Sequence, residues 1–572
     1  MDVNLSNSFD PKSSWTKRIG IILLLLLFFS TLNLWYFLSW SYLQPGQPNL
    51  LFGTLLLALC LFSSKELSFD QLDLFLLVLL CITILSQIQN PGFFYPDAIS
   101  GVQLYVLYLL IKQNREWLTM KVVAWILLII DCYILVHLIV TERIFYHLSY
   151  ETFGLFENHT ILAIFLAVSL PFVATVFKTP FWKFLVLLTV SAVVLSYSRT
   201  AFAALFISFI GYHKLLNYKA GFNIVLLILL IICVILLFVY NVDSVYGRLL
   251  IWKICISEIN YDSLFLGNGN GFLQNHYLDL QSSYFSIPRP VNEQLLAGQV
   301  HSSFNEGLRV LIEQGIFIFG AILFLIYRMY RQMFNRFFKH GPIFISFSTF
   351  LIISAFSYPL SSLPIQLIVV ILIASVNPCI HSTLRFEPFK FKGILNISFL
   401  VLVGFTVYYS ANEMKYLRKW DKLRNSNYQT YNESLYLETA ISLYPKIKDY
   451  PKIAHEYANT LYQVGLYTDA LEVANAAKEL YSNLQITMLL AAIHEELGNQ
   501  RKAEAYLKSS ISMVPKLYYP KYLLFKFYQK NQQHIQAKEW ATVISKFPIK
   551  VDSKEVQQIK QEIKEYLLTK SH

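Results

Sequence analysis

The sequence predicts an all-α protein: a polytopic membrane helical bundle with a large external loop, followed by a C-terminal tetratricopeptide-like repeat domain. Hydrophobic residues make up 55% of the 572 residues and charged residues only 15%, whereas soluble domains carry roughly a quarter charged residues. Runs such as 21–38 and 224–239 are apolar and uncharged, as expected of helices that cross a core about 30 Å thick. Beyond residue 415 the sequence becomes polar and repetitive.

The first helix and the number of spans follow from the charges and the apolar runs. Lys12, Lys17 and Arg18 precede the first apolar stretch, and no small-residue cleavage signal follows it. An uncleaved first helix with its N-terminus inside is therefore expected. At ~20 residues per helix, the chain accommodates about 13 spans. Their centres are expected near residues 29, 57, 79, 104, 130, 168, 189, 207, 231, 319, 349, 371 and 402.

Basic residues alternate between successive connections and thereby set the topology. They are frequent after every second expected span, which is the pattern of loops retained in the cytoplasm. The N-terminus is therefore expected in the cytoplasm and the large loop, 242–305, outside. An odd number of spans places the end of the chain outside as well. The expected domains are a polytopic domain at 1–411 and a soluble repeat domain at 412–572.

Charge and cysteine placement argue against two other classes of site. The net charge of +11 resides mostly in short loops and shows no basic and aromatic binding pattern, so nucleic acid is not an expected partner. Five of the six cysteines lie within or beside apolar segments, and none has metal-ligand spacing. Disulfides, a metal site and a cofactor are therefore not expected.

The loop at 242–305 is expected to be ordered. Its length suggests a functional or disordered segment, and its density of Tyr, Phe, Leu and Trp argues against disorder. A helix is expected over 248–259 and irregular chain around Pro288 and Pro290. The run Gly267-Asn268-Gly269-Asn270-Gly271 lacks the strand and helix that a phosphate cradle needs. We interpret it as a turn that packs the loop onto the membrane domain.

The C-terminal region is predicted to contain three to four tetratricopeptide-like repeats. Gly498 follows Gly465 by 33 positions, and Pro548 follows Pro515 by 33 positions, close to the ~34-residue period of such repeats. The polar helix expected at 553–567 resembles a cap. The array is expected either to bind a protein or peptide in its concave face or to pack against the membrane domain.

Two arginines are candidates for holding phosphate. Ser198-Arg199-Thr200 is expected at the external end of a span, and Arg248 lies in the external loop. Because the guanidinium fork matches phosphate oxygens, the pair predicts a clamp on an anionic lipid-linked substrate. The alternatives are an Arg199 that reaches headgroup phosphates and an Arg248 in a surface ion pair with Asp243 or Glu258.

His301 is the leading candidate for a general base, because histidine titrates near neutral pH. It precedes the next expected span on the same side as both arginines. Glu306 is the alternative base. Glu313, two turns further along the following helix, is expected to cap a helix or to pair with a buried polar group.

Five short motifs follow one another on the expected external side. They are Gly154-Leu155-Phe156-Glu157-Asn158, Ser198-Arg199-Thr200, Arg248 with Trp252, Leu266-Gly267-Asn268-Gly269 with Phe272, and Asn305-Glu306 with Leu308, Glu313 and Gly315. Their order resembles the O-antigen ligase and O-antigen polymerase superfamily, which includes the protein O-oligosaccharyltransferases. The repeat tail resembles a variant architecture of that superfamily. Many members have His-Asn where this chain has Phe304-Asn305, and Phe304 lies three residues after His301.

The resemblance implies glycan transfer from undecaprenyl pyrophosphate to an acceptor outside the bacterial inner membrane, without a metal or a nucleotide sugar. Arg199 and Arg248 would hold the pyrophosphate, and His301 would deprotonate the acceptor hydroxyl. Direct attack would invert the anomeric carbon. The residues expected to support the site are Asn158, Trp252 and Asn305.

The acceptor stays open at this point. Lipid A-core would make the protein a ligase, a growing glycan a polymerase, and protein hydroxyls a protein O-oligosaccharyltransferase. The competing class is a polysaccharide transporter or flippase with a repeat-domain tail, in which Asp131, near a span centre, would relay protons. Transporters tend to show two matching halves, and the two halves of this chain do not match, so the ligase is preferred.

Overall fold

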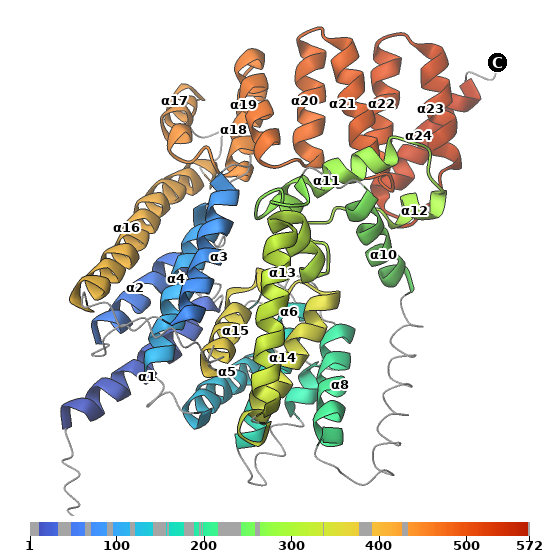
Figure 1. Ribbon diagram of the computed structural model, residues 1–572. Helices are drawn as coiled ribbons and strands as arrows, with labels where there is room; N and C mark the ends of the chain where they lie inside the picture. Colours follow the sequence, from blue (N-terminus) through green and yellow to red (C-terminus); the bar gives the residue numbers. More distant parts are fainter. Residues whose placement is uncertain are drawn as a thin grey trace, which may run out of the picture.

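The computed structural model describes residues 11–32, 47–62, 70–88, 95–114, 120–140, 156, 159–176, 188–193, 196, 198–215, 242–257, 263–335, 337–376, 392–425 and 433–569. Within these ranges the chain is helical and has no strand, which confirms the all-α prediction. Figure 1 shows a bundle built from α1–α6, α8 and α13–α15 on one side and a row of paired helices, α18–α24, on the other. The helices α10–α12 lie between them.

Apolar helices make up the bundle, and each contains one of the expected span centres. Residues 188–193, around the centre expected near 189, are helical too, while the centre expected near 231 lies outside the described residues. The helices are α1 Pro11–Thr31, α2 Gln47–Phe62, α3 Gln71–Ile88, α4 Tyr95–Gln113, α5 Met120–Val140, α6 His159–Val176, α8 Arg199–Leu215, α13 Glu306–Asn335, α14 Phe337–Phe356 and α15 Leu363–Val376.

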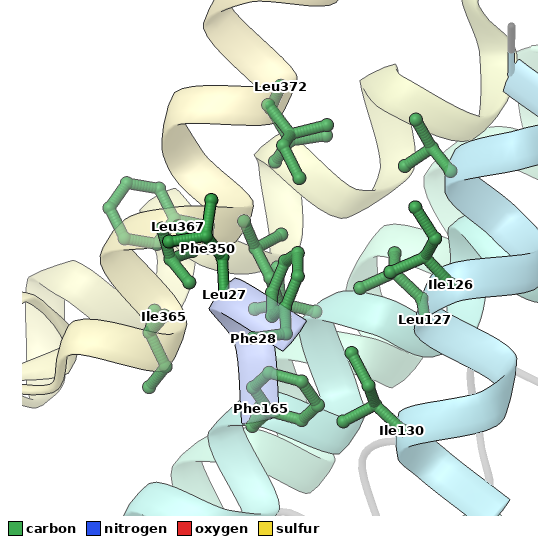
Figure 2. Close-up of a cluster of buried hydrophobic side chains, with 14 of the residues drawn as sticks. Leu27, Phe28, Ile126, Leu127, Ile130, Phe165, Phe350, Ile365, Leu367 and Leu372 are labelled. Carbon is green, nitrogen blue, oxygen red and sulfur yellow. The ribbon is translucent and has the colours of Figure 1, made fainter. Parts of the chain in front are cut away.

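A large hydrophobic core holds these helices together. Leu24, Leu27 and Phe28 recur at helical spacing, so they share one face of α1. Figure 2 shows Leu27 and Phe28 among side chains from α5, α6, α14 and α15, including Phe165 and Phe350. Each of these five side chains is buried. Helices distant in the sequence are therefore packed into one unit.

One helix in the described part of the chain is long and apolar enough to cross a membrane by length and composition. It is α13, over Glu306–Phe334. Its backbone breaks at Gly315, where φ is 80° and ψ is 175°. The shorter apolar helices are Leu51–Cys60, Leu72–Ser86, Ala98–Gln113, His159–Pro171, Arg199–Ser208, Gly341–Phe356 and Leu363–Val376.

A single long helix, α16, joins the bundle to the repeats. It spans Lys392–Asn425, 34 residues, or about 51 Å at 1.5 Å per residue. Its first half packs on α2 and contains the span centre expected near 402. Its second half enters the core of the repeats, where the Trp420 indole donates to Glu456 Oε2 at 2.9 Å. The domain boundary expected at 411/412 therefore falls inside one continuous helix.

The C-terminal helices form antiparallel pairs with the expected period. The first helices of successive pairs begin at Pro451, Leu484 and Tyr518, so the pair recurs every 33 or 34 residues. Small buried side chains, Ala470 and Ala503 among them, lie where the helices touch. The helices are α17 Glu433–Leu443, α18 Pro451–Gln463, α19 Tyr467–Leu480, α20 Leu484–Glu496, α21 Gln500–Met513, α22 Tyr518–Lys530, α23 His534–Lys546 and α24 Lys554–Thr569, with a 3-10 turn at Tyr444–Lys446. A further 3-10 turn, Pro359–Ser361, lies between α14 and α15.

The turn of the third repeat contains a residue with a strained backbone conformation. Gly465 and Gly498 adopt φ values of 85° and 74°, and the equivalent residue of the next turn is Gln532 at φ 56°. Because a side chain is strained in this region, Gln532→Gly should stabilise the α22–α23 pair by about 0.5–1 kcal/mol. Amide hydrogen exchange in the full chain would measure the gain. As a control, Gln561→Gly at an exposed position inside α24 should instead destabilise that helix by about 0.5–1 kcal/mol. Faster exchange in α22–α23 after Gln532→Gly would contradict the prediction.

Candidate functional site

The long loop at 242–305 contains three helices in its described part. They are α10 Val242–Ser257, α11 Phe272–Phe285 and α12 Val291–Leu296. Helix α10 contains the stretch predicted to be helical as far as residue 257, and the chain is irregular at 287–290, as predicted near Pro288 and Pro290. Neither α11 nor α12 was predicted: α12 has only six residues, and in α11 polar residues are interspersed among the apolar ones.

The repeat array packs against this loop. Tyr277 of α11 shares a hydrophobic core with Leu484 and Met513, which lie at the connections between helix pairs. The Ser482 amide donates to Asn275 O at 2.8 Å. Figure 1 shows α11 directly beside the array. The repeats therefore help to fold the loop, which agrees with the packing role that was one of their two expected roles.

The glycine-rich turn docks onto the break in α13. The break leaves the carbonyls of Ile312 and Glu313 without their usual helical partners. They accept instead from the amides of Asn268 at 3.0 Å and Gly269 at 2.8 Å. Gly267 and Gly315, with φ of 79° and 80°, allow the two backbones to meet. This contact confirms that the run forms a turn that packs the loop onto α13.

Glu313 caps a helix, as predicted. Its buried carboxylate Oε1 accepts from the amide of Leu273 at 3.1 Å, in the first turn of α11. The N-cap residue of α11 is Gly271, which has no side chain to serve this purpose. Glu313 thereby satisfies an amide that the helix leaves free and ties α11 to α13.

The two candidate arginines are near enough for their charges to interact. Arg199 is the first residue of α8, and Arg248 lies on α10. Arg248 Nη1 donates to Phe356 O at 2.9 Å, and its guanidinium stands 5.3 Å from the centroid of the Phe304 ring. Burial lowers the pKa of Arg248, and the positive charge of Arg199 lowers it further. Elements far apart in the sequence therefore bring two positive charges together.

An aromatic wall supports Arg248. The Phe304 ring meets Tyr358 edge to face at 5.2 Å, and Trp252 lies 6.3 Å from Phe356. Trp252 Nε1 also donates to Ser303 O at 2.8 Å, which fixes α10 to the segment before α13. Phe304 stands at φ 52°, a strained value for a phenylalanine. Sequence reasoning missed the end of α14, because a Tyr-Pro pair after an apolar helix carries no sign of a site.

Asn305 and Glu306 organise the start of α13. Asn305 Oδ1 accepts from the Leu308 amide at 2.9 Å, as an N-cap does. Glu306 Oε1 accepts from the Leu360 amide at 2.8 Å, and Oε2 lies 2.7 Å from Arg309 Nη2. Glu306 therefore belongs to the same cluster of segments, 303–306 and 356–360, as the partners of Arg248.

His301 faces the repeat array. Its Nδ1 lies 3.4 Å from Tyr481 Oη, and it lines a pocket of about 710 Å³ with residues of α18 and of the α19–α20 connection, including His455. Neither arginine is among the residues that line this pocket. The contacts of His301 thus lead to the repeats, while those of Arg248 lead to α13 and α14. Asn158, expected to support the site, lies outside the described residues.

The two pocket histidines predict an acid-sensitive contact. Burial lowers the pKa values of both His301 and His455 below their usual 6.5. The folded state therefore disfavours protonation, so their contribution to stability is complete above pH 6.5 and declines as the pH falls below it. The unfolding temperature of the full chain should fall between pH 6.5 and about pH 5. In a variant with both histidines changed to Gln, the unfolding temperature should fall less over the same pH range. Equal falls in the wild type and the variant would contradict the prediction.

Known proteins add no identification. A scan against protein-family models finds no match, and a search of curated proteins finds none either. The case for a function therefore depends on the residues and their geometry.

Proposed function

We propose that this chain is an integral membrane glycosyltransferase of the O-antigen ligase type. It would move a glycan from undecaprenyl pyrophosphate to an acceptor on the external face of a bacterial inner membrane. The chain would span the membrane about 13 times, at ~20 residues per span. The N-terminus would lie in the cytoplasm, and the long loop and the repeat array outside.

Exposed apolar stripes support the membrane assignment. Several helices of the bundle bury one face in the core and expose large apolar side chains at helical spacing on another. Soluble monomers rarely expose such patches beyond a few hundred Å², whereas lipid tails would cover them. The exposed residues include Leu74, Val78, Ile82 and Leu85 on α3, Trp125, Ile129 and Val136 on α5, Phe317, Phe324 and Tyr327 on α13, and Ile397, Val401 and Phe405 on α16.

The proximity of Arg199 and Arg248 is the observation that carries the proposal. Two like charges repel, and arginines beside lipid persist mainly where they meet a partner. The Ser198 hydroxyl, next to Arg199, is buried and makes no hydrogen bond within the described part of the chain. The amides at the start of α8 add a further attraction for an anion. A pyrophosphate would offer the Ser198 hydroxyl an acceptor and would place a negative charge beside both guanidinium groups.

Glycan transfer makes use of such a pair. The acceptor oxygen attacks the anomeric carbon while the bond from that carbon to the pyrophosphate oxygen breaks. The bonding electrons leave with the pyrophosphate, and the acceptor proton passes to a base. Because negative charge grows on the leaving group, Arg199 and Arg248 stabilise the transition state more than the bound donor.

The contacts favour Glu306 over His301 as the base. Glu306 shares its cluster with the partners of Arg248, whereas His301 faces the repeats. Glu306→Gln should lower transfer about 100-fold or more, within the range of general base catalysis, while donor binding stays unchanged. His301→Gln should have a smaller effect on transfer. Full activity of the Glu306 variant with an inactive His301 variant would return the role to His301.

Loss of the protein, followed by profiling of surface polysaccharide and glycoproteins, tests the proposal. Long undecaprenyl-linked chains beside bare lipid A-core would identify a ligase. Core that carries a single repeat unit would identify a polymerase, and unglycosylated envelope proteins with normal lipopolysaccharide a protein O-oligosaccharyltransferase. Unchanged glycans in all three fractions would refute the proposal.

Asp131 keeps a transporter or flippase as the second candidate. Its carboxylate is buried in the bundle and accepts from the Ser169 hydroxyl at 3.0 and 2.9 Å. Ionisable groups inside a membrane often serve proton relays. Asp131→Asn should stop glycan export if the protein is a transporter, and should leave glycan transfer intact if it is a ligase.

A further inference from the structure

The outward face of α16 changes abruptly from apolar to basic. Ile397, Val401, Phe405 and Tyr408 succeed one another at spacings of three or four residues and are 61%, 65%, 63% and 71% exposed. Two turns further along, the same face continues through the exposed residues Lys415, Lys419 and Lys422. Figure 1 shows α16 along the flank of the bundle, rising toward the repeats. The outward face of α16 is therefore apolar in its first half and basic in its second half.

The length of the apolar part matches a bilayer. No charged residue occurs from Gly393 to Asn412, which are 20 residues or about 30 Å of helix. Tyr408, near the upper end, has the aromatic character of the membrane–water boundary. The lysines follow two to four turns above it, on the side where headgroup phosphates lie, and long basic side chains can reach toward such phosphates.

Neither ion pairs among the described residues nor the proposed topology accounts for these lysines; Lys415 stands 6.0 Å from the centroid of the Tyr416 ring on the same helix. None of the three forms an ion pair with another residue that the structure describes. Nearby acidic groups are turned elsewhere: Glu413 interacts with the Tyr450 hydroxyl, and Asp421 pairs with Arg424 at 2.9 Å. Basic residues are expected in cytoplasmic loops, yet in the proposed topology this face is external.

We propose that Lys415, Lys419 and Lys422 bind the phosphates of anionic phospholipids in the outer leaflet, and so hold the repeat array at a fixed height above the membrane. This inference rests on the membrane topology of the proposed function but not on glycan transfer. Because α16 is continuous into the core of the repeats, lipid bound at this face acts directly on the position of the array. Charge complementarity and continuity with the apolar stripe select anionic lipid as the occupant.

The full chain, purified in detergent and stripped of lipid, tests the inference. Dioleoyl phosphatidylglycerol and dioleoyl phosphatidylcholine are titrated in turn, and bound lipid is counted by native mass spectrometry. The wild type should prefer phosphatidylglycerol. Changing all three lysines to Gln should lower affinity for it up to roughly 100-fold, at about 1 kcal/mol per basic residue. The matched control changes Lys538, Lys546 and Lys554, exposed in the repeats, to Gln and should behave as wild type.

Three outcomes would count against the inference. Equal phosphatidylglycerol binding by the wild type and the triple variant would overturn it. Loss of the phosphatidylglycerol preference on addition of inorganic phosphate alone would overturn it too. A wild-type dimer that becomes monomeric in the triple variant, without lipid preference, would assign the face to a second copy of the chain. Lipid preference together with failed glycan transfer would refute the proposed function and leave this inference standing.

Discussion

Replacement of Arg248 by alanine is expected to lower glycan transfer by about 100- to 1,000-fold. The guanidinium is held by Phe356 O and the Phe304 ring and lies close to Arg199, so its removal takes away half of the charge offered to the pyrophosphate. Loss of one oriented donor to a developing anion costs about 3–4 kcal/mol. Transfer from a purified undecaprenyl-linked donor in proteoliposomes would measure the effect.

Three comparisons separate a phosphate clamp from a structural role for Arg248. Arg248→Lys keeps the charge but loses the fork, so it should retain part of the activity. Arg501→Ala, on the exposed surface of the repeats, should retain all of it. A double variant with Arg199→Ala and Arg248→Ala should lose less activity than the two single losses combined, because both side chains would serve one headgroup in the proposed mechanism. Full activity of Arg248→Ala would remove the clamp from the mechanism.

The sequence predicts well what local chemistry decides. Apolar runs locate the helices of the bundle because every turn of such a helix repeats the same preference. The recurrence of Gly465 and Gly498 locates the repeats because their turns need a positive φ. Arg199 and Arg248 are recognisable because a charge beside a long apolar segment is unusual. Each of these signals is contained within a few turns of chain.

What the sequence does not predict depends on contacts between distant segments. The direction of His301 is set by Tyr481, 180 residues further along. The wall around Arg248 combines Phe304 with Phe356 and Tyr358, whose approach follows from the packing of α13 and α14. The boundary expected at 411/412 reflects a change of composition that a continuous helix crosses without a break. Periodicity carries no information about these tertiary choices.

The contact between the loop and α13 predicts the largest effect on folding. An added Cβ at Gly315 would lie 2.2 Å from Phe265 O, and one at Gly267 would lie 2.2 Å from Glu313 O. Backbone atoms cannot yield as a flexible side chain does. Gly315→Ala should therefore cost about 3 kcal/mol or more, from the positive φ and the overlap together. The full chain should lose thermal stability in detergent, and the long loop should become sensitive to protease.

Gly320 supplies the matched control in the same helix. An added Cβ there would meet nothing within 4 Å, and α13 is regular at that position, so Gly320→Ala should be neutral or stabilise the helix by up to about 1 kcal/mol. The two substituted positions lie five residues apart in α13, and only the Cβ at position 315 would meet backbone atoms of the loop. If both variants unfolded at the wild-type temperature, the turn at Gly267 would not dock as described.

Because this turn holds α11 and α13 together and α13 begins beside Arg248, Gly315→Ala should also abolish glycan transfer without touching a residue of the proposed clamp.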